Sequence, residues 1–120
     1  MGQDASQVVV VTTPSLPGFR VVRTVGFAWG LVVRSRGLGG NIKAGLRSIV
    51  GGEITEFTQM LESARSHAVE RLRVQAAELG ANAVISARFD SSEIGQTMSE
   101  VLAYGTAVVV EPGEAPSPAD

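Results

Sequence analysis

The chain contains no cysteine, a single histidine and few aromatic side chains among its 120 residues. The absence of cysteine excludes disulfide bonds, thiolate metal ligands and thiol catalysis. Aromatic residues make up 5% of the chain and apolar residues 44%, so we expect an aliphatic core in one domain. No apolar run approaches the length of a membrane-spanning helix, and the polar start lacks the features of a signal peptide. We therefore expect a soluble cytoplasmic protein with no membrane partner.

Basic and acidic residues are unevenly distributed. Residues 5–52 hold six basic residues and no acid, whereas residues 53–120 hold eleven acids and four basic residues. This asymmetry is compatible with an anion or nucleic-acid surface in the basic segment Arg20–Arg47. The alternative is that the basic half of one copy meets the acidic half of another. We favour the alternative because the isoelectric point is near 5.4 and aromatic residues are few.

The first half of the chain reads mainly as strand. The β-branched run at residues 8–12 predicts a short strand that is buried on both faces. Residues 19–34 predict a longer strand, which Gly26 and Gly30 bend or bulge. A glycine-rich loop follows, and residues 42–50 predict a short helix.

The second half predicts a long helix followed by a strand hairpin. Apolar residues recur every three or four positions over residues 56–79, the period of an amphipathic helix. Gly80 is expected to end this helix in the left-handed conformation. A strand over 83–90 then presents alanines on one face, which let the helix approach closely. Residues 90–96 predict a hairpin loop, and residues 97–110 the return strand.

Several stretches, read together, resemble the YbjQ-like family of small bacterial and archaeal proteins. They include "GLRSIVGG", the "LGANAV" turn after the long helix and the closing "GTAVVV". The resemblance implies an α+β subunit, similar to a dodecin subunit, with an antiparallel β-sheet backed by one long and one short helix. It also implies assembly as a homopentameric ring and no established enzymatic activity. On this basis the domain spans 8–111, between a disordered arm at 1–7 and a disordered, proline-rich acidic tail at 112–120.

Two helices cannot cover both faces of so apolar a sheet, so we expect other copies of the chain to cover the remainder. Copies that cover one another could add without limit, and a closed ring stops this addition at a fixed number of copies. Trp29 and Leu31 make their strand more apolar than is usual in the family. The residues expected at the interface between copies are Val8, Val9, Val10, Trp29, Leu31, Tyr104, Val108, Val109 and Val110.

The family carries the label "putative heavy-metal-binding domain", but the sequence offers few ligands for such an ion. His67 and Glu70 lie three positions apart on the long helix and supply two ligands where three or four are needed. We favour a half-solvated surface histidine, and no other cofactor is indicated. Asp90 and Glu93 could bind a hard cation through oxygen, although acidic turns are usually solvated.

Other candidate sites are weaker still. Arg34, Arg36 and Lys43 flank a glycine-rich segment that could bind an anion, but the segment matches neither common phosphate-binding motif. Ser63, His67 and Glu70 have the composition of a catalytic triad without an oxyanion hole or cleft.

The sequence favours a non-enzymatic homo-oligomeric module that binds a small ligand or a partner. Phe27, Trp29 and Tyr104 could line a ligand pocket between copies, although packing at the interface is the simpler role. A heavy-metal-binding protein is the first alternative. The second is an anion or nucleic-acid binder that uses Arg20–Arg47.

Overall fold

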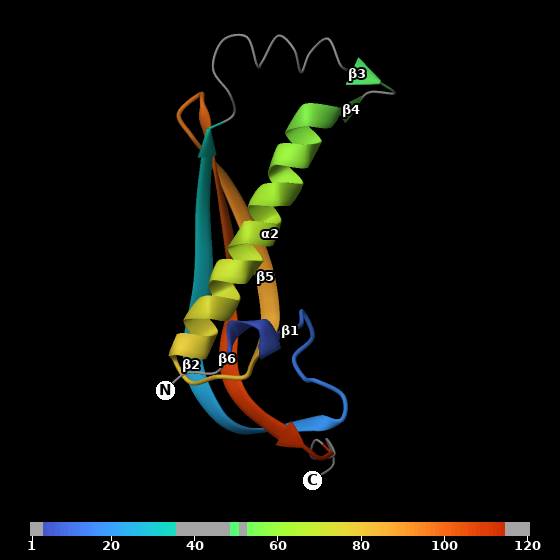
Figure 1. The fold of residues 1–120 in the computed structure, drawn as a ribbon, viewed down its shortest axis with the longest axis vertical. Helices are drawn as coiled ribbons and strands as arrows, with labels where there is room; N and C mark the ends of the chain where they lie inside the picture. The colour runs from blue at the N-terminus through green and yellow to red at the C-terminus, as the bar shows by residue number, and fades with distance from the viewer. Residues whose placement is uncertain (1–3, 36–48, 51–52, 115–120) are drawn as a thin grey trace.

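The computed structural model describes residues 4–35, 49–50 and 53–114. A long helix crosses one face of a curled sheet, and the molecule is elongated, with extents of 57 × 32 × 23 Å (Figure 1). The elements in chain order are η1 (Ala5–Gln7), β1 (Val9–Val10), β2 (Phe19–Ser35), β3 (Ile49–Val50), β4 (Glu53–Ile54), α2 (Thr55–Glu78), β5 (Ala83–Ile94) and β6 (Met98–Pro112). The architecture is α+β, as the sequence predicts.

The main sheet has the strand order β1-β5-β6-β2. Strand β6 pairs antiparallel with both β2 and β5, whereas β1 pairs parallel with β5. The sheet is therefore mixed, and the prediction of a purely antiparallel sheet is wrong. The reason is that the turn after β1 carries the chain to the opposite edge, so the neighbour of β1 in space is β5 and not β2.

Helix α2 begins and ends within one residue of the predicted bounds. Its end is fixed by two backbone hydrogen bonds: Ala81 N–H donates to Ala76 C=O at 2.9 Å, and Gly80 N–H donates to Ala77 C=O at 3.0 Å. This pair of bonds satisfies the last carbonyl groups of the helix and requires a left-handed residue. Gly80 supplies it, with φ of +88°.

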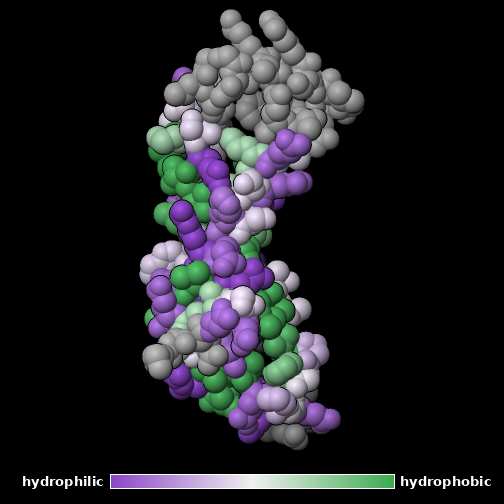
Figure 2. All heavy atoms as spheres, in the orientation of Figure 1, coloured by the Kyte–Doolittle hydropathy of each residue, from purple (hydrophilic) through white to green (hydrophobic). Residues whose placement is uncertain are grey.

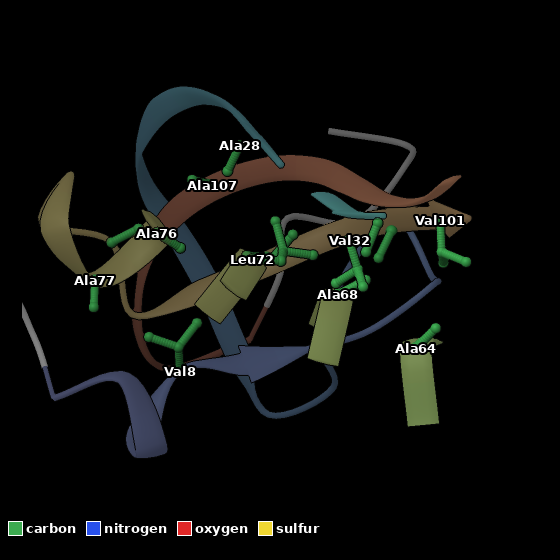
Figure 3. Packing of buried hydrophobic residues seen from close by; sticks show 14 residues of the cluster. Val8, Ala28, Val32, Ala64, Ala68, Leu72, Ala76, Ala77, Val101 and Ala107 are labelled. Carbon is green, nitrogen blue, oxygen red and sulfur yellow. The ribbon is translucent and has the colours of Figure 1, made fainter. Parts of the chain in front are cut away.

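The core between α2 and the sheet is aliphatic and built largely from alanine (Figure 3). Ala64, Ala68, Leu72 and Ala76 form the buried stripe of the helix, as their spacing predicts. Leu61, by contrast, is 39% exposed. The largest side chains that are fully buried are Leu72, Val84, Val101 and Val108. Because alanine side chains are short, the helix and the sheet lie close together.

The closest approach of α2 to the sheet is at Gly30 of β2. A Cβ at this position would lie 2.2 Å from the carbonyl oxygen of Ala68 and 2.5 Å from the backbone nitrogen of Leu72. Gly30 therefore serves helix packing and does not bend the strand, which differs from the prediction. The pairing of β2 is irregular at two places, between Val21 and Arg23 and between Thr24 and Gly26. The second irregularity confirms the bulge that was predicted at Gly26.

The hairpin of β5 and β6 also differs from the prediction. Strand β5 continues to Ile94, so residues 90–94 belong to the ladder and the loop is shorter than expected. The register shifts between Ile85 and Arg88, where Ser86 has a φ of +54°. This bulge breaks the simple alternation expected over residues 83–90.

Three further predictions concern short segments. Residues 49–50, expected at the end of a short helix, pair instead with β4, and the rest of that predicted helix lies outside the described residues. Within the arm that was expected to be disordered, Asp4 caps η1. The Ser6 amide and hydroxyl donate to the Asp4 carboxylate and lower its pKa. Within the tail that was expected to be disordered, Gly113 N–H donates to Gly18 C=O at 3.0 Å.

Candidate functional site

The two faces of β2 carry side chains of different size. Ala28, Gly30 and Val32 lie under α2 and are buried. The alternate residues point to the opposite face of the sheet, where they are largely exposed: Phe27 is 61% exposed, Trp29 45%, Leu31 39% and Val33 47%. Large apolar side chains held in a row by one strand form a patch, unlike single apolar residues scattered over a surface.

Strand β6 extends this patch. Tyr104 pairs with Trp29 and Leu102 pairs with Leu31, and directly paired residues share a face of the sheet. The Phe27 ring centroid lies 5.5 Å from that of Trp29 and 6.0 Å from that of Tyr104, within the range of favourable aromatic contacts. We name these six residues the aromatic face: Phe27, Trp29, Leu31, Val33, Leu102 and Tyr104.

Helix α2 lies on the other side of the sheet and leaves the aromatic face uncovered. Figure 2, in the same view as Figure 1, shows exposed apolar residues on both sides of the polar outer surface of α2. The helix does reach the free edge of β2. Trp29 N–H donates to Gln75 Oε1 at 2.5 Å, and Arg71 Nη1 donates to Leu31 C=O at 2.6 Å. These contacts occupy backbone groups that an added strand would need, so a partner would use the face and not this part of the edge.

The residues predicted to bind metal lie beside arginines. His67 Nδ1 contacts Arg34 Nη2, and because a guanidinium only donates hydrogen bonds, His67 accepts through Nδ1. Glu70 lies 3.6 Å from Arg73 Nη1 in an ion pair. The described residues contain no group of three or more histidine, aspartate or glutamate side chains that could hold a metal ion. Neighbouring guanidinium charges also oppose the approach of a cation.

The other predicted sites are not assembled in the described residues. Asp90 and Glu93 lie on strand β5, and their odd spacing places them on opposite faces. Arg34 lies near the end of β2, in contact with His67. Arg36 and Lys43 lie outside the described residues.

The predicted interface residues fall into two groups. Val8, Val108 and Val110 are 2%, 1% and 8% exposed, so the chain itself covers them. Val8 belongs to the core beneath α2, whereas Val108 and Val110 pack against Leu16 and Ile85. Val9, Trp29 and Leu31 are exposed. The partly exposed members of the predicted set are Val10, Tyr104 and Val109.

The sequence analysis missed a groove between α2 and the strands β1 and β5. Two adjoining cavities of about 280 and 210 Å³ share Val69, Arg73 and Phe89 in their walls. Arg65 lines one cavity and Arg88 the other. The spacing of Arg65, Val69 and Arg73 on one helix was the available signal, because residues four apart share a helix face.

A larger cavity of about 490 Å³ lies between the first half of α2 and the β5–β6 hairpin. Its walls combine apolar residues, such as Met60, with Arg65, three serines, Glu93 and Glu100. The Ser92 hydroxyl donates to Glu100 Oε2 at 2.6 Å, so the polar rim is partly satisfied by its own contacts.

Among the described residues, no helix is long and apolar enough to cross a membrane.

The described residues define a small α+β domain in which one helix covers a mixed sheet and an aromatic cluster lies on the uncovered face. The chain belongs to the YbjQ family, whose model is described as "Putative heavy-metal-binding" and matches residues 8–111.

Relatives from several organisms are similar over most of the chain. A UPF0145 protein of Methanoregula boonei is 62% identical over 108 residues, covering 90% of each chain. A UPF0145 protein of Bradyrhizobium sp. is 64% identical, covering 87% of this chain and 94% of the relative. Among solved structures, a DUF74-family protein of unknown function from Pediococcus pentosaceus shares the fold, with a TM-score of 0.54 and 14% identity. The match covers 87% of this chain and 98% of that one.

Proposed function

We propose that the protein is a non-enzymatic homo-oligomeric module that binds a small ligand or a partner, and that its copies associate through the aromatic face. The observation that carries this proposal is the exposure of Phe27, Trp29, Leu31 and Val33 in a row on one strand. The family resemblance supports a closed ring of five copies as the form of the assembly.

The shape of the chain supports association. Its radius of gyration is 18.0 Å, whereas a compact domain of this length would have one of about 14 Å. An elongated chain leaves more of its sheet accessible, and aromatic side chains are enriched where proteins associate. A second copy covering the aromatic face would bury the patch that α2 leaves open, and a cyclic arrangement would prevent unlimited growth.

The test is the mass in solution, measured by light scattering at micromolar concentration. The unmodified chain is expected at a multiple of 12.5 kDa, the mass of one copy. The double variant Phe27→Ser/Trp29→Ser is expected to shift to the mass of one copy. A matched control is Val21→Ser/Val22→Ser, which removes two exposed apolar side chains from the curled end of β2 and is expected to keep the assembly.

Circular dichroism shows whether each variant remains folded. A single-copy mass for the unmodified chain would refute the oligomer. If the control variant dissociates and the Phe27/Trp29 variant keeps the mass of the assembly, the interface lies elsewhere on the chain.

A heavy-metal-binding role is the second candidate, favoured by the description of the family. Because the described residues lack a three-ligand cluster, a metal site would need ligands from outside those residues or from more than one copy. Elemental analysis of the purified protein beside His67→Ala tests this role. Stoichiometric metal that is lost in the variant would support it, and absence of metal from both proteins after incubation with Zn²⁺ would exclude it.

A further inference from the structure

We propose that the groove lined by Arg65, Arg73, Arg88 and Phe89 binds a small organic oxyanion, that is, a carboxylate or phosphate carried on a flat apolar body. We name it the arginine groove. The inference rests on the small-ligand part of the proposed function and specifies the class of ligand. It does not depend on how many copies assemble, because all four residues belong to one chain.

Helix α2 and strand β5 carry the charged and aromatic residues of the arginine groove, and Val10, Thr12 and Ala103 complete its walls. Arg65, Val69 and Arg73 follow one another at intervals of four along α2, so they lie on one side of the helix. Phe89, which pairs with the buried Ala103, faces them from β5, directly after the bulge at Ser86. Arg88 pairs with Tyr104 and so starts from the other face of the strand, and it reaches the rim of the groove beside Thr12. Bulges re-aim the side chains that follow them and recur beside functional sites. The two cavities, of about 280 and 210 Å³, are together of a size suited to a small ligand.

The lining of the arginine groove carries three guanidinium groups and no acidic residue. Arg73 Nε donates a hydrogen bond to Val8 C=O at 3.2 Å. Arg73 also forms an ion pair with Glu70, which is not part of the lining. Arg65 and Arg88 form no ion pair within the described part of the chain. Two of the three guanidinium groups therefore lack a carboxylate partner among the described residues, and a bound oxyanion would supply one.

The arginines are also oriented to bind. Arg88 Nη1 donates to Thr12 C=O at 2.9 Å and to Ala87 C=O at 2.8 Å, which fixes its position. A guanidinium has five N–H donors, so Arg88 retains others for a ligand. Charge-assisted hydrogen bonds from arginine to a carboxylate or phosphate are among the stronger ones in proteins.

The rest of the lining suits a flat apolar group. The Arg65 guanidinium lies 5.6 Å from the Phe89 ring centroid, the geometry of a cation–π contact. Phe89 is 47% exposed, so its ring is accessible to a second planar group. Val69, Leu72 and Ala87 add aliphatic surface. An aromatic body would therefore stack on Phe89 while its oxyanion meets the guanidinium groups of Arg65, Arg73 and Arg88.

The test uses 1-naphthyl phosphate as the probe, with 1-naphthol and inorganic phosphate as its two halves. Isothermal titration calorimetry on the full chain is expected to show saturable binding of 1-naphthyl phosphate that is at least ten-fold tighter than binding of either half. The affinity is expected to fall as salt is added, because exposed charges are screened. Equal affinity for 1-naphthol would overturn the proposal, since the arginines would then contribute nothing.

Substitutions locate the site. Arg65→Gln and Arg88→Gln are each expected to weaken binding roughly ten-fold, the loss of one charge-assisted contact. Arg65 is exposed and forms no hydrogen bond with described residues, so its variant should fold even if Arg88→Gln does not. The control, Arg20→Gln, removes an equal charge from an exposed pair with Glu111 and should leave affinity unchanged. Equal weakening in all three variants would show attraction to net charge only and refute the groove.

The mass in solution is measured on the same samples, so that the two proposals fail separately. Loss of probe binding in an intact assembly would refute the arginine groove alone. Retained binding by a single-copy chain would refute the assembly alone.

Discussion

Strand β2 separates two apolar surfaces that differ in how they are used. On the side of α2, Ala28 and Val32 are 0% and 3% exposed, and Gly30 lets the helix backbone approach. On the other side, Phe27 and Trp29 are 61% and 45% exposed. Small residues therefore stand where the chain packs against itself, and large ones where nothing in the described chain covers them. The comparison indicates that the sheet has one intramolecular partner and space for another.

The energetic consequences of the two faces differ as well. Full burial of one large apolar side chain contributes about 1.5–3 kcal/mol. The helix side already contributes this to the folding of one chain. The aromatic face would contribute it only on association, where it must offset lost translational and rotational freedom. Substitutions on the helix side should therefore change stability most, and those on the aromatic face should change assembly.

The largest effect is expected at the centre of the helix side. Leu72→Ala should lower the free energy of unfolding by about 3 kcal/mol, because Leu72 is fully buried and its truncation leaves a cavity. The matched control is Leu61→Ala on the same helix, where the side chain is 39% exposed and the loss should stay below about 1 kcal/mol. Urea denaturation at one fixed protein concentration measures both. Similar losses would mean that the buried stripe is not the core of the fold.

A somewhat smaller effect is expected at Gly30. Gly30→Ala places a Cβ against the backbone of Ala68 and Leu72, which cannot move without shifting the helix, so a loss of about 2 kcal/mol is expected. Val33→Ala on the same strand truncates an exposed side chain and should change stability by about 0.5 kcal/mol or less. A neutral Gly30→Ala would show that α2 lies farther from β2 than the structure places it.

The features that the sequence predicted correctly depend on local patterns. The spacing of Ala64, Ala68 and Leu72 predicted the helix and its buried stripe, and Gly80 predicted its end. Trp29 and Leu31 are exposed, and their place at a surface between copies stays a prediction. In each case the decisive information lies within a few residues of the chain.

The features that the sequence missed depend on distant contacts. The parallel pairing of β1 with β5 joins segments more than 70 residues apart, and no local pattern specifies it. The bulge at Ser86 reverses the facing of the residues after it, so alternation failed there. The arginine groove combines Arg65 and Arg73 of α2 with Arg88 of β5, and its charge is apparent only when the helix lies on the sheet. The sequence favoured His67 as a half-solvated surface residue over a metal ligand, but it did not predict the contact with Arg34, which is equally non-local.

The smallest effect is expected at the edge where the two faces of β2 meet. Arg71→Met keeps much of the side-chain length but removes the donor to Leu31 C=O, and a loss of about 1 kcal/mol is expected. The carbonyl is at a sheet edge that water can reach, so the cost should not approach that of a buried group. Arg71→Lys should recover part of the loss, because the ammonium can donate one bond to the same oxygen. If Arg71→Met and Arg71→Lys are both as stable as the unmodified chain, the contact of Arg71 with the edge contributes nothing, and packing at Gly30 and Leu72 dominates the attachment of α2 to β2.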